Sequence, residues 1–251
     1  MKGAFLSPCV RDEARKNTGK DGACGRHLLN PNRQTGMEDS MNRRDFLWTA
    51  VLLAVAAGWS GRAGAAGEGE TIDLPEPERS GGMPLMQALD NRRSQRSFSS
   101  EELDARTLSN LLWAAWGVNR DSGKRTAPSA NNRQEITVYC AMRAGCYRYE
   151  AERHRLVRIT ERDLRAETGS QGFTEEAPLN LVYAADMVQA SSEFYAACDT
   201  GFISQNVYLF CASDGLATVV RGWVDRERLS EAMGLPGSMR IMLCQTVGRP
   251  G

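Results

Sequence analysis

The chain has 251 residues, of which 41% are hydrophobic and 25% charged, a composition typical of one globular domain with a tail. Its 31 basic and 31 acidic residues balance, so the net charge does not point to nucleic acid as a partner. Two histidines, and seven cysteines without a CxxC pair, leave little material for a metal site. Lys124 is the only lysine beyond position 20, which excludes Schiff-base chemistry from most of the chain.

The first 40 residues are polar, rich in Gly, Asn, Arg and Lys, and lack both helical and strand periodicity. Such a composition cannot bury enough apolar surface to fold. We therefore expect residues 1–40 to be disordered or to lie upstream of a true start at Met41.

A secretory leader is predicted next, over residues 41–66. Arg43 and Arg44 precede a short apolar run, residues 48–59, and a small-residue A-x-A sequence ends at Ala65. The Arg-Arg-x-Phe-Leu order resembles the twin-arginine signal of proteins that are exported folded. We expect a periplasmic protein without a stable membrane span after processing. A retained membrane anchor is the alternative, which the short apolar run disfavours.

Residues 67–82 are rich in Pro, Gly and acidic side chains and form a flexible N-terminal arm, either a linker or a segment that wraps a neighbour. The remainder, residues 83–251, is the folded domain. It begins with a helix predicted over residues 83–91. A second helix is predicted to open at residues 99–103, where serines precede glutamates, and to end at Gly117. Its buried face comprises Leu103, Leu108, Leu111, Leu112, Ala115 and Trp116.

Three short strands are predicted to form a meander over residues 135–142, 146–150 and 155–159. Cys140 and Cys146 flank the first turn of this meander. In an oxidising compartment they are candidates for a disulfide, but cross-strand geometry is often poor, so two free thiols are the default expectation.

The C-terminal half alternates apolar strands and helices without strict βαβ order. Helices are predicted over residues 162–169, 191–198, 199–212 and 225–233, and strands over residues 177–184, 216–220 and 239–247. Gly215 is expected to stop the long buried helix. This pattern, together with the meander, predicts an α+β fold with a central, mainly antiparallel sheet flanked by helices.

A cluster of arginines directly follows the first predicted helix. Arg92, Arg93 and Arg96 lie close to Ser94 and Ser97. A guanidinium is a fork of fixed donors that suits a phosphate, and a serine hydroxyl adds a short donor. The stretch therefore predicts an anion site, although a solvated turn at a helix end is the alternative for so short a motif.

Two further polar groups are candidates for ligand contacts. The loop over residues 119–134 contains Ser129, Asn132 and Gln134, and loops on a rigid scaffold often carry binding residues. Gln205 and Asn206 interrupt the long apolar helix. Buried amides need partners, so these two either bond neighbouring backbone or face a ligand.

In chain order, four stretches resemble the FMN-dependent nitroreductase family, and most closely its SagB-type dehydrogenase branch. They are the arginine cluster over residues 92–98, the loop over residues 128–134, the hairpin over residues 145–150, and the helix-to-strand segment over residues 205–222. Each motif alone is weak, but their agreement in order over most of the exported domain is specific.

The resemblance implies FMN as the cofactor. Arg92, Arg93, Ser94 and Arg96 would hold its phosphate and ribityl chain, Ser129, Asn132 and Gln134 would lie beside the ring, and Gln205, Arg221 and Gly222 would reach the flavin. Arg221 or Arg93 would stabilise the negative charge of the reduced ring.

It also implies a homodimer with FMN at the subunit interface, which exchanges hydride between an electron donor, such as NAD(P)H, and a small acceptor, such as a nitroaromatic or a quinone. No catalytic side chain is assigned, because the flavin itself transfers the hydride. The alternatives are a non-catalytic flavin- or ligand-binding member of the fold and an interaction domain with an anion site. Family members often embrace the partner with a C-terminal extension; this sequence ends at Gly251, so residues 67–82 are the candidate for that role.

Overall fold

The computed structural model of the protein describes residues 69–251. The expected disordered segment, the leader and the first two residues of the arm lie outside this part. The strands are β1 (Thr71–Asp73), β2 (Ile136–Met142), β3 (Gly145–Glu150), β4 (Arg155–Thr160), β5 (Leu179–Asp186), β6 (Ala217–Arg221) and β7 (Met239–Gly248). The helices are α2 (Leu85–Asn91), α3 (Ala105–Trp116), α4 (Phe173–Glu176), α5 (Glu193–Asp214) and α6 (Arg226–Met233), with 3-10 turns η1 (Ala130–Asn132) and η2 (Ala166–Thr168).

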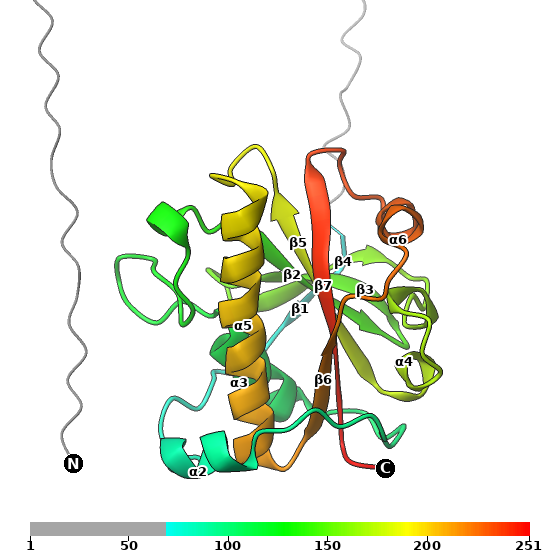
Figure 1. Cartoon of the computed structure of the whole chain (residues 1–251). Helices are drawn as coiled ribbons and strands as arrows, with labels where there is room; N and C mark the ends of the chain where they lie inside the picture. The colour runs from blue at the N-terminus through cyan, green and yellow to red at the C-terminus, as the bar shows by residue number, and fades with distance from the viewer. Residues whose placement is uncertain (1–68) are drawn as a thin grey trace, which may run out of the picture. The chain divides into compact units, whose positions relative to one another are not determined.

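The strands form one seven-stranded sheet in the order β1-β4-β3-β2-β5-β7-β6 (Figure 1). Every neighbouring pair is antiparallel. The predicted meander is its β2-β3-β4 portion. The α+β prediction with an antiparallel sheet is therefore confirmed.

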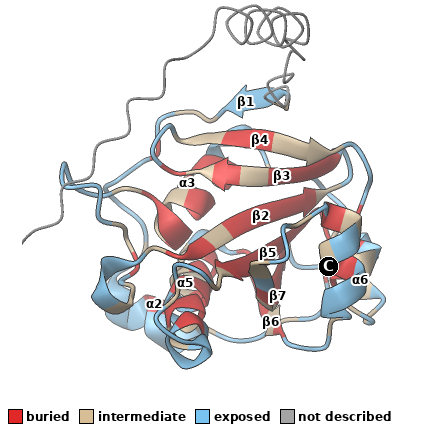
Figure 2. Ribbon diagram, turned by 90° about the horizontal axis from the view of Figure 1, so that it is seen from above, coloured by how far each residue is buried: buried red, intermediate tan, exposed pale blue. Residues whose placement is uncertain are grey.

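Helices cover both faces of this sheet, as Figure 2 shows, with α3 and α5 on one side and α6 on the other. The alternation along β2 decides which side chain enters which layer. Val138 and Cys140 pack in the larger core with α3 and α5, whereas Tyr139 and Ala141 pack with residues of α6.

The same alternation settles the state of Cys140 and Cys146. Ala141, rather than Cys140, lies opposite Cys146 in the β2-β3 register. The two sulfurs consequently belong to different cores on opposite faces of the sheet, and both are buried free thiols. The default expectation of two free cysteines is confirmed.

Helix boundaries differ from the prediction where capping decides them. Asp104 caps α3, because its carboxylate accepts hydrogen bonds from the backbone N–H groups of Arg106 and Thr107 at 3.0 and 2.9 Å. The expected start at residues 99–103 was wrong, since residues 99–103 are not helical and α3 begins at Ala105, directly after the Asp104 cap.

The two helices expected over residues 191–198 and 199–212 form a single helix of 22 residues, α5. Ser192 caps its start and Gly215, in the left-handed conformation, ends it as predicted. An interior glycine, Gly201, costs about 1 kcal/mol. Burial of one face of α5 against the sheet offsets that cost.

Two short elements were not expected. β1, in the arm, pairs with β4 at the edge of the sheet, and α4 precedes β5. Residues 162–169, expected to be a helix, contain only the 3-10 turn η2. Within residues 69–251, no helix is long and apolar enough to cross a bilayer.

Candidate functional site

The arginine stretch, residues 92–96, leaves the end of α2 and runs extended beside the edge strand β6. The Gln95 N–H donates to the Thr218 carbonyl at 3.0 Å, and slightly further on Phe98 pairs with Pro250 near the C-terminus. The backbone is thus fixed on two sides. The side chains of Arg93, Ser94 and Arg96 are exposed to solvent.

Tyr208 of α5 lies beneath this stretch. Its hydroxyl is 2.8 Å from the Ser94 hydroxyl and accepts a hydrogen bond from the Val220 N–H at 3.0 Å. The Arg92 guanidinium carbon lies 5.3 Å from the centre of the Tyr208 ring, within cation–π range. Tyr208 was not predicted from the sequence. The available signal was a tyrosine in an apolar helix, because a buried phenol needs a hydrogen-bond partner.

The charges of the stretch are not neutralised within the protomer. In the part of the chain that the structure describes, no ion pair joins Arg92, Arg93 or Arg96 to a carboxylate. Three guanidinium groups within five residues repel one another, and an anion would relieve that repulsion.

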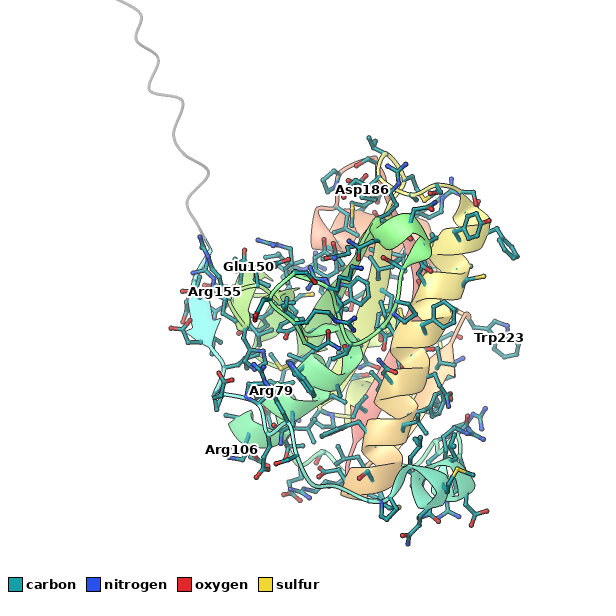
Figure 3. All side chains as sticks on the ribbon, turned by 90° about the vertical axis from the view of Figure 1, so that its left-hand side faces the viewer. Arg79, Arg106, Glu150, Arg155, Asp186 and Trp223 are labelled. Carbon is teal, nitrogen blue, oxygen red and sulfur yellow. The ribbon has the colours of Figure 1, made fainter. Side chains whose placement is uncertain are left out.

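A shallow cavity of about 310 Å³ adjoins the stretch. Arg96, Gln171, Phe173, Gly222 and Trp223 are among its lining residues. The Gln171 Oε1 atom is buried and has no hydrogen-bond partner among the described residues. Trp223 is 76% exposed and projects away from the body of the protein (Figure 3).

Arg221 contributes to the cavity wall, but its guanidinium turns inward. It is 6% exposed and donates to the Thr168 carbonyl at 2.6 Å, to Asn180 Oδ1 at 2.9 Å and to Thr246 Oγ1 at 3.0 Å. Burial lowers the pKa of Arg221. A Cβ on Gly169 would lie 2.0 Å from its Nη1, so this position has no room for a side chain. The geometry therefore gives the Arg221 side chain an internal role.

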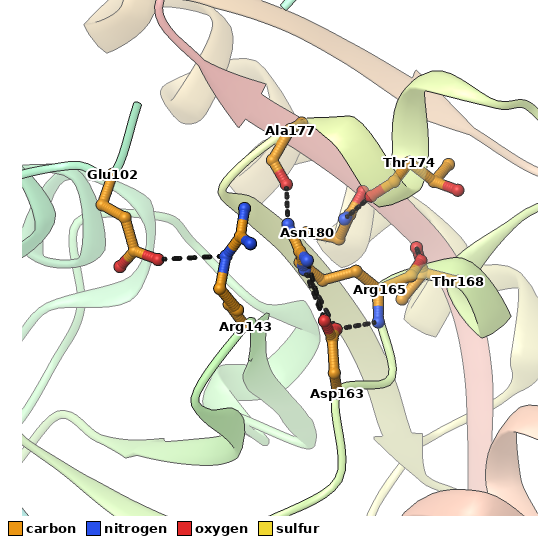
Figure 4. A network of polar contacts seen from close by, with 8 residues as sticks. All are labelled: Glu102, Arg143, Asp163, Arg165, Thr168, Thr174, Ala177 and Asn180. Carbon is orange, nitrogen blue, oxygen red and sulfur yellow. Dashed lines mark hydrogen bonds and ion pairs between the residues drawn. The ribbon is translucent and has the colours of Figure 1, made fainter. Parts of the chain in front are cut away.

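A second buried arginine fixes the segment that carries Gln171 and Phe173. Arg165 forms a salt bridge with Asp163 at 2.7 Å and donates to the Ala177 carbonyl at 3.0 Å, as Figure 4 shows. The segment that carries Gln171 and Phe173 is therefore held at both of its ends, at Asp163 and at Ala177.

The loop over residues 129–134 has a folded conformation with unusual backbone angles. Asn131, Asn132 and Gln134 have φ values of 52°, 53° and 52°, in the left-handed region that L-residues enter at a cost of about 1–3 kcal/mol each. The Ser129 hydroxyl accepts from the Gln134 N–H at 3.0 Å, and the Ala130 N–H donates to Asp199 Oδ2 at 2.8 Å. These hydrogen bonds to side chains stabilise a loop conformation that the backbone alone disfavours.

The amides of this loop differ in availability. Gln134 Oε1 accepts from Arg125 at 2.9 Å, while its Nε2 donates to the Gly123 carbonyl and to Asn132 Oδ1, both at 3.2 Å. Asn132 is exposed. Gln134 therefore supports the loop from within, while Asn132, whose Oδ1 accepts from Gln134, is the more exposed of the two amides.

The two polar residues of α5 are also separated. Asn206 donates to the Ala114 carbonyl at 3.1 Å and joins α5 to α3. Gln205 is exposed. Of the two alternatives expected for these amides, Asn206 therefore takes the first, a hydrogen bond to backbone, while the exposed Gln205 remains a candidate for a ligand contact.

One protomer does not bring all the predicted site residues together. The arginine stretch contacts α5 at Tyr208, whereas the loop contacts it at Asp199. These positions are nine residues apart, about 13 Å at 1.5 Å per residue. Each protomer thus carries two separate polar groups along one helix.

Exposed apolar side chains lie on both helices, in one group on α2 beside the C-terminal half of α5 and in another on the N-terminal half of α5. They are Leu85, Met86 and Leu89 on α2, and Phe194, Tyr195 and Phe202 on α5. Scattered apolar residues are normal on a surface, but several large ones on adjoining helices indicate a face that another molecule covers.

Comparison with known proteins gives a consistent result. Residues 89–249 match the model of the nitroreductase family. A curated protein of Methanocaldococcus jannaschii with nitroreductase in its name is 34% identical over 172 residues, which is 62% of this chain and 85% of that protein.

Solved structures share the fold. The structure of a Ralstonia eutropha protein described as a nitroreductase has 44% identity and a TM-score of 0.70, over 74% of this chain and 91% of that one. A Desulfovibrio desulfuricans protein, solved in complex with FMN, has 19% identity and a TM-score of 0.52, over 68% and 88%. The second likeness shows the fold alone.

Proposed function

The chain belongs to the nitroreductase family, and from this premise we propose that it is an FMN-dependent oxidoreductase that exchanges hydride between an electron donor and a small organic acceptor. The observation that carries the proposal is the set of three arginines that have no ion-pair partner among residues 69–251, one of which, Arg96, lines the cavity at Gly222. A solved protein of this fold holds FMN, which supports the choice of cofactor.

The residues present fit this cofactor. Arg92, Arg93 and Arg96 supply cationic donors for a phosphate, and Ser94 adds a hydroxyl that Tyr208 orients. When bound, FMN supplies the hydride donor and acceptor, so no protein nucleophile is required.

The remaining tasks fall to side chains at the cavity. Since the Arg221 guanidinium is committed internally, Arg93 is the better candidate to stabilise negative charge on the reduced ring. Gly222 leaves the cavity edge open, and Trp223 offers a flat apolar surface to an aromatic or quinone acceptor.

We propose further that the functional unit is a homodimer. Its contact would cover the apolar side chains of α2 and α5, and it would place the loop of one protomer, with Ser129 and Asn132, near the arginine stretch of the partner. A complete site would then draw on both of the polar groups that a single protomer keeps apart.

Flavin loading tests the proposal. We expect the protein purified from its native host to be yellow, and Arg93→Ala and Arg96→Ala each to weaken FMN binding roughly 10- to 150-fold, from the 1.5–3 kcal/mol of a charge-assisted hydrogen bond. Arg106→Ala is the matched control, because Arg106 is exposed on α3, away from Trp223 in Figure 3. Colourless protein that does not bind added FMN would contradict the proposal. Anaerobic reduction of the flavin followed by reoxidation with a quinone or nitroaromatic would separate turnover from binding alone.

The finer assignments are also proposals. The sequence over residues 41–66, outside the described residues, supports export by the twin-arginine route; mass spectrometry of the mature protein should then find an N-terminus near Ala66 or Gly67. The hairpin over residues 145–150 supports the SagB-type branch. Because NAD(P)H is scarce outside the cytoplasm, an exported enzyme would use another electron donor.

A further inference from the structure

Two buried acidic side chains lie at the loop over residues 129–134: Glu135 directly follows it, and Asp199 bonds its Ala130 N–H and is within hydrogen-bond reach of the Glu135 carboxyl group. Glu135, the residue before β2, is 2% exposed, and Asp199 of α5 is 1% exposed. Asp199 Oδ2 accepts the Ala130 N–H at 2.8 Å. Both carboxyl oxygens of Glu135 are buried without a hydrogen-bond partner among residues 69–251 when the two acids are ionised. Neither residue was predicted from the sequence.

The charges around this pair do not compensate two carboxylates. Arg133, exposed on the loop, is the cation that favours ionisation of Glu135. Asp186 donates its backbone N–H to the Glu135 carbonyl, but its own carboxylate turns to the Val188 N–H at 3.0 Å. Two adjacent buried carboxylates repel each other strongly, and one proton shared between them removes that repulsion.

The direction of the Glu135 pKa agrees with this geometry. Burial is the largest cause and raises the pKa of Glu135; its own backbone N–H lowers it, and the hydrogen bond and the charge of Asp199 raise it further. A proton on Glu135 also lets its otherwise unpartnered carboxyl group donate a hydrogen bond to the Asp199 carboxylate.

We propose that Glu135 is protonated and donates a hydrogen bond to Asp199, and that this carboxyl pair positions the loop over residues 129–134. The chain of bonds runs from the Glu135 hydroxyl to the Asp199 carboxylate, which also receives the Ala130 N–H. It holds Asn131 and Asn132 in their left-handed conformation. That the loop so held presents Ser129 and Asn132 to FMN rests on the proposed function. Glu135 and Asp199 are positioning residues.

The pair makes stability depend on pH with a definite sign. Because the pKa of Glu135 is raised in the folded protein, the stabilisation is fully present below its ordinary value near 4.5 and is lost as pH rises through the folded value. Glu135→Gln keeps a donor toward Asp199 but does not titrate. The thermal midpoint of the wild type should therefore fall relative to Glu135→Gln as pH increases from 5 to 9.

The experiment compares thermal unfolding of the wild type, Glu135→Gln and Glu231→Gln across this pH range. Glu231 is exposed on α6 and is the matched control, whose curve should run parallel to that of the wild type. In the same series, FMN affinity should decrease with pH by about tenfold in the wild type and stay constant in Glu135→Gln. Parallel midpoint curves for the wild type and Glu135→Gln would overturn the proposal.

Thermal curves do not require FMN, so the two proposals fail separately. Divergent curves in a protein that never binds FMN would support the carboxyl pair and reject the flavin function. Parallel curves in a yellow, FMN-loaded protein would reject the carboxyl pair and support the flavin function. If Glu135→Gln does not fold, infrared spectroscopy of the wild type at neutral pH tests the proposal instead. We expect the carbonyl band of a buried protonated carboxyl group, and absence of this band would reject the carboxyl pair.

Discussion

Tyr208 links three parts of the candidate site through one ring and one hydroxyl. The hydroxyl satisfies the Val220 N–H of the edge strand β6 and also contacts Ser94, while the ring lies under Arg92. A buried phenol that is fully bonded in this way restricts its neighbours to one arrangement. The arginine stretch is therefore oriented before any anion arrives, which reduces the entropy cost of binding.

Tyr208→Phe should weaken both stability and anion binding. The change leaves the Val220 N–H without its partner and frees Ser94, so we expect a loss of about 1–2 kcal/mol in the free energy of unfolding and weaker FMN binding. Chemical denaturation and FMN titration measure the two effects. Tyr195→Phe, at an exposed position of the same helix, is the control and should be nearly neutral. Equal behaviour of the two variants would contradict the role assigned to Tyr208.

At the scale of elements, the N-terminal arm is held to the domain by a relay of polar side chains. The Ser109 hydroxyl of α3 donates to the Pro75 carbonyl at 2.5 Å, and His154 Nε2 lies 2.7 Å from the Ser109 hydroxyl oxygen. Since that hydroxyl hydrogen is already used, Nε2 must carry the proton, and Nδ1 accepts from the Tyr149 hydroxyl at 2.8 Å. Burial lowers the pKa of His154, which favours this neutral ring.

Ser109→Ala should release the arm without unfolding the sheet. Loss of the bonds to Pro75 and His154 should lower hydrogen-exchange protection of β1 and its neighbours in the arm roughly tenfold, because about 1.4 kcal/mol corresponds to that factor. Ser204→Ala is the matched control, since Ser204 is also a buried helical serine but donates within its own helix, to Gly201. Unchanged exchange in the arm of Ser109→Ala would show that β1 pairing alone holds it.

At the scale of the whole molecule, the placement of apolar and charged surface favours assembly. The exposed apolar residues of α2 and α5 adjoin the arginine stretch and the loop. An interface there would bury hydrophobic area at about 25 cal/mol per Å² and would join two half-sites into one. Dimerisation and flavin binding should consequently be linked, each strengthening the other.

Phe202→Glu should shift the protein toward monomer and lower its flavin content. Phe202 is 47% exposed on α5, and a carboxylate there would oppose burial against a second copy. Analytical ultracentrifugation measures the mass, and the flavin-to-protein absorbance ratio measures loading. Arg106→Glu, at an exposed position of α3 outside both the arm and the apolar residues of α2 and α5, is the control and should leave both unchanged. A wild type that is monomeric and fully loaded with flavin would contradict the dimer proposal.

Much of the fold follows from local pattern. Alternation in β2 and β3, the apolar face of α3, and the glycines that end helices each depend on neighbours within a few residues, so the sequence predicted them. The arginine cluster was equally visible, because a charged motif is local. By contrast, Ser99 looked like a helix cap, but its segment is extended and pairs with the C-terminal segment, where the Ser99 N–H donates to the Arg249 carbonyl, 150 positions away.

Tertiary structure decided which polar residues are used internally and which remain available. Arg93 and Arg221 are the same residue type, yet the first is exposed and the second is bonded to Thr168, Asn180 and Thr246 from three other segments. Glu135 and Asp199, 64 positions apart, became a pair only when β2 packed against α5. A single chain read in order shows which groups are charged, but their surroundings, and hence their protonation and role, depend on long-range packing.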